Sequence, residues 1–278
     1  MNTVDQALQR GPVGVFNRAA NTYDSHGPRF FSILGRGLVE FAGVAPGTAV
    51  LDIAAGRGAV LFPAADCVGP DGNVVGIDLA ENMVIETTAE IERAERRNAK
   101  MLRMSADHLE FANNSFDYVL CGFGLWFFPR PEHSLQEMLR VLKPGGCLAL
   151  TTWSKDCPFL VWVRREIAAS LPPPAPPPVR KKPVPTFDTP EKIDTALGQA
   201  GFTGIDIDLQ EHDFVYSDDE DWWLSLWSHG IRRRFEKLDA AALEKLKSEM
   251  IQKVQFMKRA DGIHTSWHAL FARSFKPS

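Results

Sequence analysis

The segment from Val50 to Ala59 constrains the fold more than any other part of the chain, and it reads Val-Leu-Asp-Ile-Ala-Ala-Gly-Arg-Gly-Ala. An apolar run that suits a buried strand passes through Asp52 into a turn of glycine and alanine. Small residues in such a turn let the backbone approach a ligand closely, because a larger side chain would collide with it. Glycine turns without a ligand are also common, so this motif alone predicts a strand–turn–helix unit and leaves its purpose open.

The chain from Thr48 to Trp153 alternates short β-rich runs with helical ones. The candidate strands in this region are residues 49–53, 73–78, 116–121 and 146–152. Helical spacing follows at residues 80–98 and 131–142. Repeated β–α units predict a parallel sheet with helices on both faces, and ligands bind beyond the carboxyl ends of the strands in such sheets.

The remaining regions show weaker patterns. Helical spacing is visible at residues 33–41, 189–201 and 219–235, and strand patterns occupy residues 205–209 and 266–275. The run from Pro172 to Pro178 contains proline and one alanine, which favours an extended surface linker. A docking segment for a proline-recognition module is the alternative for this run.

The formal net charge of −4 argues against a nucleic-acid-binding protein, because such proteins usually carry a basic excess. The four cysteines, Cys67, Cys121, Cys147 and Cys157, include no CxxC pair, so neither a zinc site nor a redox motif is visible. The first ten residues lack the apolar core of a signal peptide, and no run is long enough to span a bilayer. We therefore expect a cytoplasmic protein that binds no membrane.

A second acidic residue, Asp78, ends the predicted strand at residues 73–78 and lies 20 positions after Gly58. In Rossmann-like folds a carboxylate at this distance accepts hydrogen bonds from ribose hydroxyls. An exposed strand end, or an N-cap for a helix that begins near Glu81, is the structural alternative. Together with the glycine turn, Asp78 favours a cofactor that contains a nucleoside.

The identity of that cofactor can be narrowed by elimination. The dinucleotide fingerprint needs a glycine three positions after Gly58, where Leu61 stands, and Ala54 occupies the place of its first glycine. The chain also has no Walker A sequence. A carboxylate at Asp52 suits an ammonium group better than a pyrophosphate, and the methionyl tail of S-adenosylmethionine carries an ammonium group. The residues therefore favour S-adenosylmethionine over NAD.

The segment Val50–Gly58 resembles the first motif of the class I S-adenosylmethionine-dependent methyltransferases. Four further segments resemble later motifs in the same order, namely residues 76–83, 105–111, 116–121 and 140–146. Residues 17–24 are similar to the N-terminal segment of the ubiquinone/menaquinone-biosynthesis type of small-molecule methyltransferase. The resemblance covers residues 15–153 well and the remainder loosely.

This resemblance implies a Rossmann-like α/β fold with a mostly parallel seven-stranded sheet and helices on both faces. It divides the chain into an N-terminal helical lid (1–45), a cofactor-binding core (46–155), a Pro-rich linker or insertion (156–188) and a C-terminal part that completes the sheet and covers the acceptor (189–278). S-adenosylmethionine would be the cofactor and S-adenosylhomocysteine the product.

The same resemblance assigns cofactor-binding roles residue by residue. In the family a tyrosine at the position of Tyr23 often covers the cofactor, a methionine at Met83 lies by the adenine, and an acid at Asp107 holds the adenine amino group. The full predicted set is Tyr23, Asp52, Ala54, Gly56, Gly58, Asp78, Leu79, Met83, Ala106, Asp107 and Cys121. The chain departs from the family at Ala54 and Arg57, where glycine and a small residue are commoner.

We expect an acceptor pocket above the carboxyl ends of the strands, with apolar walls from the loop after residue 121 and from the C-terminal region. The predicted lining residues are Phe123, Trp126, Trp162, Trp223 and Trp227, although ordinary helix packing also explains the last three. His26, His229 and Tyr23 are the candidate bases. Many relatives carry a histidine near Trp126, and its absence weakens the case for a histidine base in that loop. His264 and His268 lack a third ligand, so we assign no metal.

These residues predict a methyltransferase for a small apolar or aromatic metabolite, of a biosynthetic or natural-product tailoring type. An S-adenosylmethionine-binding enzyme with non-methylating chemistry, such as a cyclase, would share the same motifs. An NAD(P)-dependent oxidoreductase and a non-enzymatic binding protein are further alternatives. The sequence leaves the acceptor identity and the oligomeric state, including a homo-oligomer, open.

Overall fold

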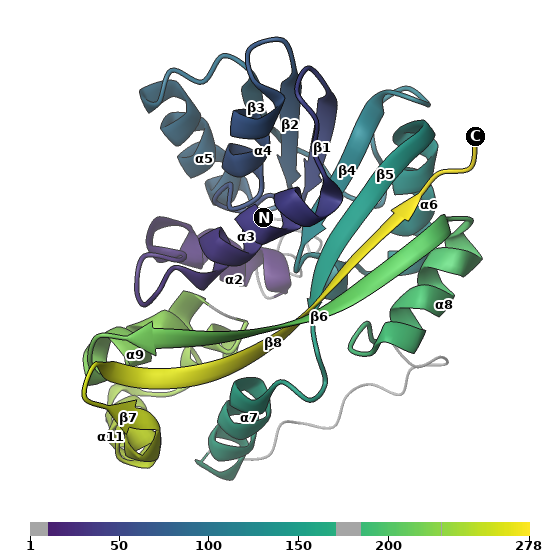
Figure 1. Cartoon of the computed structure of the whole chain (residues 1–278). Coiled ribbons are helices and arrows are strands. Elements are labelled where there is room, and N and C mark those ends of the chain that lie inside the picture. The colour runs from purple at the N-terminus through teal and green to yellow at the C-terminus, as the bar shows by residue number, and fades with distance from the viewer. Residues whose placement is uncertain (1–10, 171–184, 229) are drawn as a thin grey trace.

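The computed structural model describes residues 11–170, 185–228 and 230–278. Its centre is a sheet with the strand order β3-β2-β1-β4-β5-β8-β6 (Figure 1). The strands are β1 (Ala49–Ile53), β2 (Asn73–Asp78), β3 (Ala99–Arg103), β4 (Phe116–Gly122), β5 (Leu142–Trp153), β6 (Thr203–Tyr216) and β8 (Gly262–Phe275). The first five run parallel to one another, whereas β8 is antiparallel to both β5 and β6. The predicted Rossmann-like fold with a mostly parallel sheet is confirmed, and β7 (Lys258–Arg259) adds a two-residue strand beside β8.

Helices cover both faces of this sheet because the strands alternate their side chains. Val50 faces a cluster that includes residues of α3 (Phe30–Ala42), α4 (Leu61–Val68) and α5 (Glu81–Arg93). Leu51 faces the opposite cluster, with residues of α6 (Pro131–Val141) and α8 (Pro190–Ala200). Successive strand residues point to opposite faces, so a strand buried on both sides reads as a continuous apolar run.

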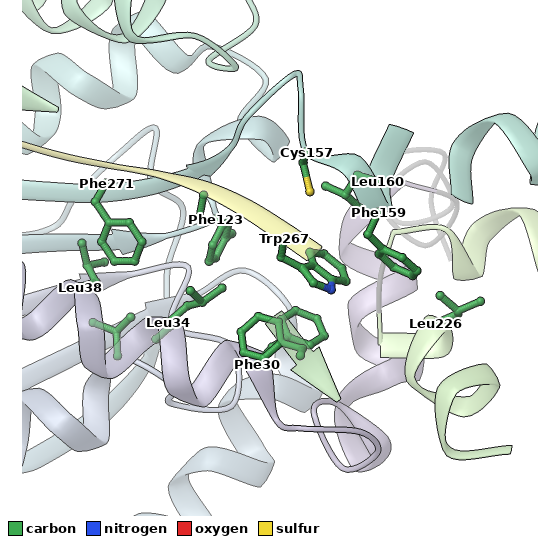
Figure 2. Close-up of a cluster of buried hydrophobic side chains, with 14 of the residues drawn as sticks. Phe30, Leu34, Leu38, Phe123, Cys157, Phe159, Leu160, Leu226, Trp267 and Phe271 are labelled. Carbon is green, nitrogen blue, oxygen red and sulfur yellow. The ribbon is translucent and has the colours of Figure 1, made fainter. Parts of the chain in front are cut away.

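The strands β6 and β8 extend beyond the rest of the sheet as a two-stranded ribbon (Figure 1). Residues 269–275 of β8 pair with β5, whereas residues 263–268 pair with residues 211–216 of β6. Helices α7 (Pro158–Ser170), α9 (Asp219–Ser225), α10 (Arg232–Phe235) and α11 (Ala240–Val254) lie around this extension. Trp267 is fully buried there, with its ring 4.8 Å from the rings of both Phe30 and Phe159 (Figure 2). The ribbon therefore joins the C-terminal helices and the N-terminal helix α3 in one apolar core.

The N-terminal region consists of α2 (Pro12–Ala19), the short 3₁₀ helix η1 (Ala20–Thr22) and α3. Helix α3 packs against β4, β5, β8 and α4, so it belongs to the layer that covers the sheet. The side chain of Asp24 accepts hydrogen bonds from the backbone N–H groups of Phe31 and Ser32 and thereby caps the start of α3. Helix α3 thus covers the sheet although it falls within the predicted lid at residues 1–45. Of the described residues in that range, those before α3 do not cover the sheet.

Several predicted boundaries differ from the structure. Strand β3 and helices α7 and α11 were not predicted, whereas the helix expected after the glycine turn is present as α4. Strands β6 and β8 are longer than expected. The helix predicted at 80–98 ends at Arg93, and Glu95 adopts a left-handed conformation with φ of 50°. The helix predicted at 219–235 is divided into α9, the 3₁₀ helix η3 (Leu226–Ser228) and α10. The proline run at 172–178 lies outside the described residues.

Candidate functional site

A cavity of about 520 Å³ opens at the carboxyl edge of the parallel strands. Its walls come from the turn after β1, the end of β2, the loop after β4, the end of β5, and helices α2, α7 and α10. Cavities of this size are typical of sites that hold a cofactor or a small organic molecule. The cavity therefore lies where the parallel sheet predicts a ligand.

The glycine turn after β1 forms one wall of the cavity. Ala54 and Gly56 line it, and both have positive φ angles, 58° and 52°. The Gly56 N–H donates to the Asp78 carboxylate, and its carbonyl accepts from the hydroxyl of Thr87. Gly58 faces away from the cavity, because a Cβ at this position would lie 2.6 Å from the ring of Phe62. The turn thus needs small residues both for its backbone angles and for its packing.

Asp78 ends β2 and presents its carboxylate to the cavity. One oxygen accepts from the N–H of Gly56 at 2.9 Å, and the other from the N–H of Ala80 at 2.8 Å. Each carboxylate oxygen has lone pairs beyond this single bond, so both oxygens can still accept from ligand hydroxyls. Burial raises the pKa of Asp78, and its backbone hydrogen bonds act in the opposite direction. Asp78 therefore fixes the turn and also offers acceptors to a ligand.

Asp52 lies beneath the turn and is not part of the cavity lining. Its side chain is fully buried, and among the described residues no donor has ordinary hydrogen-bond geometry to either carboxylate oxygen. Desolvation raises its pKa well above the ordinary value and the charge of Asp78 raises it further, whereas the nearby backbone N–H of Leu61 acts in the opposite direction. The structure thus places this carboxylate below the wall of the cavity, so it can act on a ligand there only through the turn.

A second group of residues lines the cavity on the side of β2 and α5. Leu79, Met83, Ala106 and Asp107, which the sequence predicted to bind the cofactor, all line this part. Asp107 is held by the hydroxyl of Ser134 and by the guanidinium of Arg130. A carboxylate fixed in this way can accept a hydrogen bond from a ligand amino group at a defined position.

Aromatic rings in contact with one another form a contiguous part of the cavity wall, which we call the aromatic wall. Tyr23 stacks on Phe31 at 5.0 Å, and Phe123 stacks on Trp153 at 4.1 Å. Phe31 joins the two pairs through an edge contact with Phe123 at 5.9 Å, and all four rings line the cavity. Phe123 has a positive φ angle of 56°, an unusual conformation that aims its ring into this wall. Planar apolar molecules and organic cations both bind well to such surfaces.

The comparison with known families decides which ligand class the cavity serves. A model described as the ubiE/COQ5 methyltransferase family matches residues 10–164. The chain belongs to this methyltransferase family. The matched segment contains the glycine turn, Asp78, Asp107 and Phe123. The enzyme class and the cofactor predicted from the sequence, S-adenosylmethionine, are confirmed at the level of the family.

Individual relatives agree with this assignment. The chain is 36% identical over 148 residues to the aklanonic acid methyltransferase DauC of Streptomyces sp. (strain C5), a match that covers 53% of this chain and 67% of that protein. It is 43% identical over 138 residues to the nocamycin O-methyltransferase of Saccharothrix syringae, covering 49% of each chain. The chain thus spans between about half and two thirds of the length of these relatives. The solved structure of the [4+2]-cyclase SpnF has a TM-score of 0.59 at 19% identity, over 98% of this chain and 95% of its own, and shows a shared fold.

The cavity of this methyltransferase fits S-adenosylmethionine on several observations. Asp78 offers carboxylate acceptors that suit a ribose, and Asp107 offers an acceptor that suits an adenine amino group. The turn leaves room at Gly56, where a Cβ would meet no atom within 4 Å. A cationic tail above the turn would lower the raised pKa of the buried Asp52 and favour the charged form of its carboxyl group. The adjoining aromatic wall suits a sulfonium group.

The predicted cofactor residues Gly58, Asp52 and Cys121 do not line the cavity. Cys121 lies beneath it, with its sulfur 3.0 Å from where a Cβ on Gly124 would be. Burial raises the pKa of Cys121 to about 12, so the group stays a neutral thiol. Gly58, Asp52 and Cys121 therefore shape the floor of the site from below, because they face the packed layers.

Three of the predicted acceptor-pocket residues lie elsewhere. Phe123 and Trp126 line the cavity, whereas Trp162, Trp223 and Trp227 do not. Trp223 is buried and stacks on Phe235 at 5.1 Å, and Trp227 packs on the same ring. Trp223 and Trp227 therefore belong to the C-terminal core, where they take part in the ordinary packing of amphipathic helices. Sequence reasoning missed Phe16, Phe31 and Trp153 as lining residues, and only Trp153 carried a signal, since it directly follows the strand predicted at residues 146–152.

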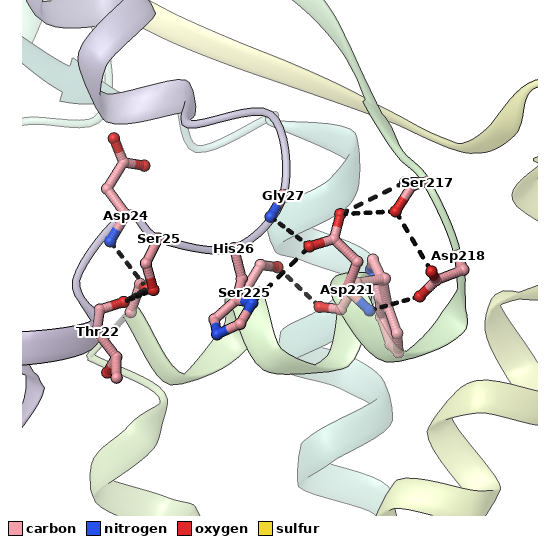
Figure 3. A network of polar contacts seen from close by, with 11 residues as sticks. Thr22, Asp24, Ser25, His26, Gly27, Ser217, Asp218, Asp221 and Ser225 are labelled. Atoms are coloured by element: carbon pink, nitrogen blue, oxygen red, sulfur yellow. Dashed lines mark hydrogen bonds and ion pairs between the residues drawn. The ribbon is translucent and has the colours of Figure 1, made fainter.

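The candidate bases lie in different places relative to the cavity. Tyr23 lines the cavity, but burial raises its pKa well above the ordinary value, so its hydroxyl remains protonated. His26 is outside the cavity lining and lies 4.0 Å from a carboxylate oxygen of Asp221, which also accepts from the N–H of Gly27 (Figure 3). His229 falls outside the described residues. His26 therefore belongs to a polar network that ties the N-terminal loop to α9.

Helix α2 is held over the cavity by contacts from three directions. Asn17 accepts from the N–H of Asn82 at the start of α5. The guanidinium of Arg57 donates to the carbonyl of Ala20 at 2.6 Å, which gives a structural use to this departure from the family pattern. Arg18 forms an ion pair with Glu236.

In the described parts of the chain, no group of three or more candidate ligands forms a metal site, and no helix is long and apolar enough for a membrane span.

Proposed function

We propose that this protein transfers the methyl group of S-adenosylmethionine to a small aromatic or largely apolar metabolite. The observation that carries the proposal is the single cavity that joins two unlike surfaces. One surface, with Gly56, Asp78 and Asp107, suits an adenosyl group, and the other is the aromatic wall of Tyr23 and its neighbours. The names of the two curated relatives support this choice, since both are methyltransferases and one is an O-methyltransferase.

Catalysis in this cavity would depend on positioning. Bound S-adenosylmethionine supplies an electrophilic methyl group, and displacement requires a nucleophile in line behind it. The aromatic wall would orient a planar acceptor by stacking and exclude water from the methyl group. Helix α2 would close the cavity over both molecules, and this assigns a lid function to residues before α3.

Proton removal needs no dedicated base in this scheme. Tyr23 stays protonated, and no histidine lines the cavity among the residues that the structure describes. Tyr23 can therefore donate a hydrogen bond but cannot accept the acceptor's proton. An acceptor oxygen that is already ionised, or that loses its proton to water, would satisfy this site.

The test is a methyl-transfer assay with S-adenosylmethionine labelled on its methyl group and a panel of aromatic phenols and acids. We expect the label to enter at least one acceptor, with an equal amount of S-adenosylhomocysteine released. Trp153→Leu should lower acceptor turnover and leave the affinity for S-adenosylhomocysteine unchanged, whereas Val161→Ala, an exposed position outside the cavity, serves as the control. Product formation without release of S-adenosylhomocysteine would refute methyl transfer and favour cyclase-type chemistry.

A further inference from the structure

We propose that the acceptor carries a carboxylate on an aromatic skeleton, and that Arg164 and Arg234, which line the cavity from α7 and α10, bind this carboxylate. This inference rests on the proposed function and specifies the substrate class of the same site. The proposal adds two guanidinium groups to an acceptor pocket whose other predicted walls are apolar.

The two arginines reach the cavity from separate segments. Arg164 lies on α7 and Arg234 on α10, and both line the cavity. On α7 the lining residues Leu160, Arg164 and Ile167 follow helical spacing, so one face of this helix points into the site. Asp78 and Asp107, by contrast, reach the cavity from the end of β2 and from the loop after β3.

Neither guanidinium has a partner within the parts of the chain that the structure describes. Their sequence neighbours differ in this respect, because Arg165 pairs with Glu166 at 2.8 Å and Arg232 pairs with Glu236 at 2.8 Å. Arginine presents a planar set of donors that matches a carboxylate in bidentate geometry. Two unpaired guanidinium groups among the residues that line one cavity therefore favour an anionic ligand.

The charged residues that line the cavity come from different segments of the chain. The acidic lining residues in the described chain are Asp78 and Asp107, which the proposed function assigns to the adenosyl group. Leu160, Ile167 and Ile231 are apolar lining residues that lie within four positions of Arg164 or Arg234 along the chain. Arg164 is exposed and Arg234 is half-buried, so both guanidinium groups are accessible to a ligand that enters from solvent. This arrangement fits an amphipathic molecule with one acidic group.

The cofactor's own carboxylate is the competing anion. Arg234 lies beyond residues 10–164, the segment that matches the family model, and Arg164 is the last residue of that segment. A cofactor site shared by the family needs no residue beyond the shared segment, whereas acceptor recognition varies between members. The placement of Arg234 outside the shared segment favours the acceptor as the anion that Arg234 binds.

The experiment compares anthracene-2-carboxylate with its neutral amide, anthracene-2-carboxamide, by calorimetric titration with and without saturating S-adenosylhomocysteine. We expect the acid to bind about 10- to 100-fold more tightly than the amide, as a charge-assisted hydrogen-bonded pair predicts. Arg164→Gln and Arg234→Gln should each reduce this preference and leave binding of the amide unchanged. Arg165→Gln and Arg233→Gln are matched controls from the same two helices, and they should keep the full preference.

Three results would overturn the proposal. The first is equal affinity of the wild-type protein for acid and amide, and the second is a preference that survives both substitutions. The third is a loss of affinity for S-adenosylhomocysteine, but not for methylthioadenosine, in the two variants, which would assign the arginines to the cofactor carboxylate. A wild-type protein that prefers the acid but does not bind S-adenosylhomocysteine would retain the anion site and refute the proposed function instead.

Discussion

Replacement of Asp78 by alanine tests the double role that the structure gives to this carboxylate. In the free protein the side chain accepts from the N–H groups of Gly56 and Ala80 at 2.9 and 2.8 Å. Each donor left without its partner costs about 1 kcal/mol where cavity water can replace the acceptor. The expected loss of stability is therefore about 2 kcal/mol, or a decrease in Tm of roughly 4–8 °C for a chain of this size.

The effect on cofactor binding should be larger than the effect on stability. Two charge-assisted bonds to ribose hydroxyls contribute about 1.5–3 kcal/mol each, so Asp78→Ala should weaken S-adenosylhomocysteine binding by about 10²- to 10⁴-fold. Asp78→Asn keeps one acceptor oxygen, and we expect an intermediate loss. Calorimetric titration gives the affinities, and differential scanning fluorimetry gives Tm. An Asp78→Ala protein that is destabilised as expected but binds S-adenosylhomocysteine within about threefold of wild type would refute the ribose contact.

Three further substitutions test other parts of the structure. Gly27→Ala should destabilise the protein by about 1–3 kcal/mol in chemical denaturation, because φ is 74° and the new Cβ would lie 2.6 Å from the ring of Tyr216. Gly43→Ala is the control, and it should cost less because Gly43 has a similar φ but open space around it. Equal losses of stability in the two variants would contradict the packing argument. Burial raises the pKa of Asp52, so the folded protein binds this proton more tightly than the unfolded chain, whose value is about 3.9. The contribution of Asp52 to stability is therefore lost as the pH rises from that value through the raised pKa. Asp52→Asn should reduce the dependence of Tm on pH over this window. An unchanged dependence would show that Asp52 does not titrate there. Trp223→Ala should cost about 3–5 kcal/mol in unfolding free energy without a selective rise in the acceptor KM, and such a selective rise would place Trp223 in the pocket.

The cofactor half of the site was readable from the sequence because its function depends on the backbone. A turn of positive φ angles needs glycine or a small residue, and a carboxylate at the end of the adjacent strand follows from the β–α order. Gly56 and Asp78 therefore left a local signature that survives without coordinates. The depth of each side chain was not readable, and Asp52 lies below the turn, outside the cavity lining, because alternation along β1 points it into the packed layer.

The acceptor half depends on contacts between distant segments, which no local pattern encodes. Tryptophans 223 and 227 were predicted to line the pocket on hydrophobicity alone, yet they pack on Phe235. Trp153 and Phe31 meet in the aromatic wall although more than a hundred residues separate them in the chain. The same limit applies to the ribbon, because the length of β6 and β8 is set by their mutual pairing and by the burial of Trp267.

Calorimetric titration of the wild-type protein with S-adenosylhomocysteine, and separately with NADH, tests the central claim most directly. We predict saturable binding of one S-adenosylhomocysteine per chain and no measurable heat of binding for NADH. A folded protein that takes up NADH, or that shows no binding of S-adenosylhomocysteine, would contradict the assignment of the cavity to an adenosyl amino acid.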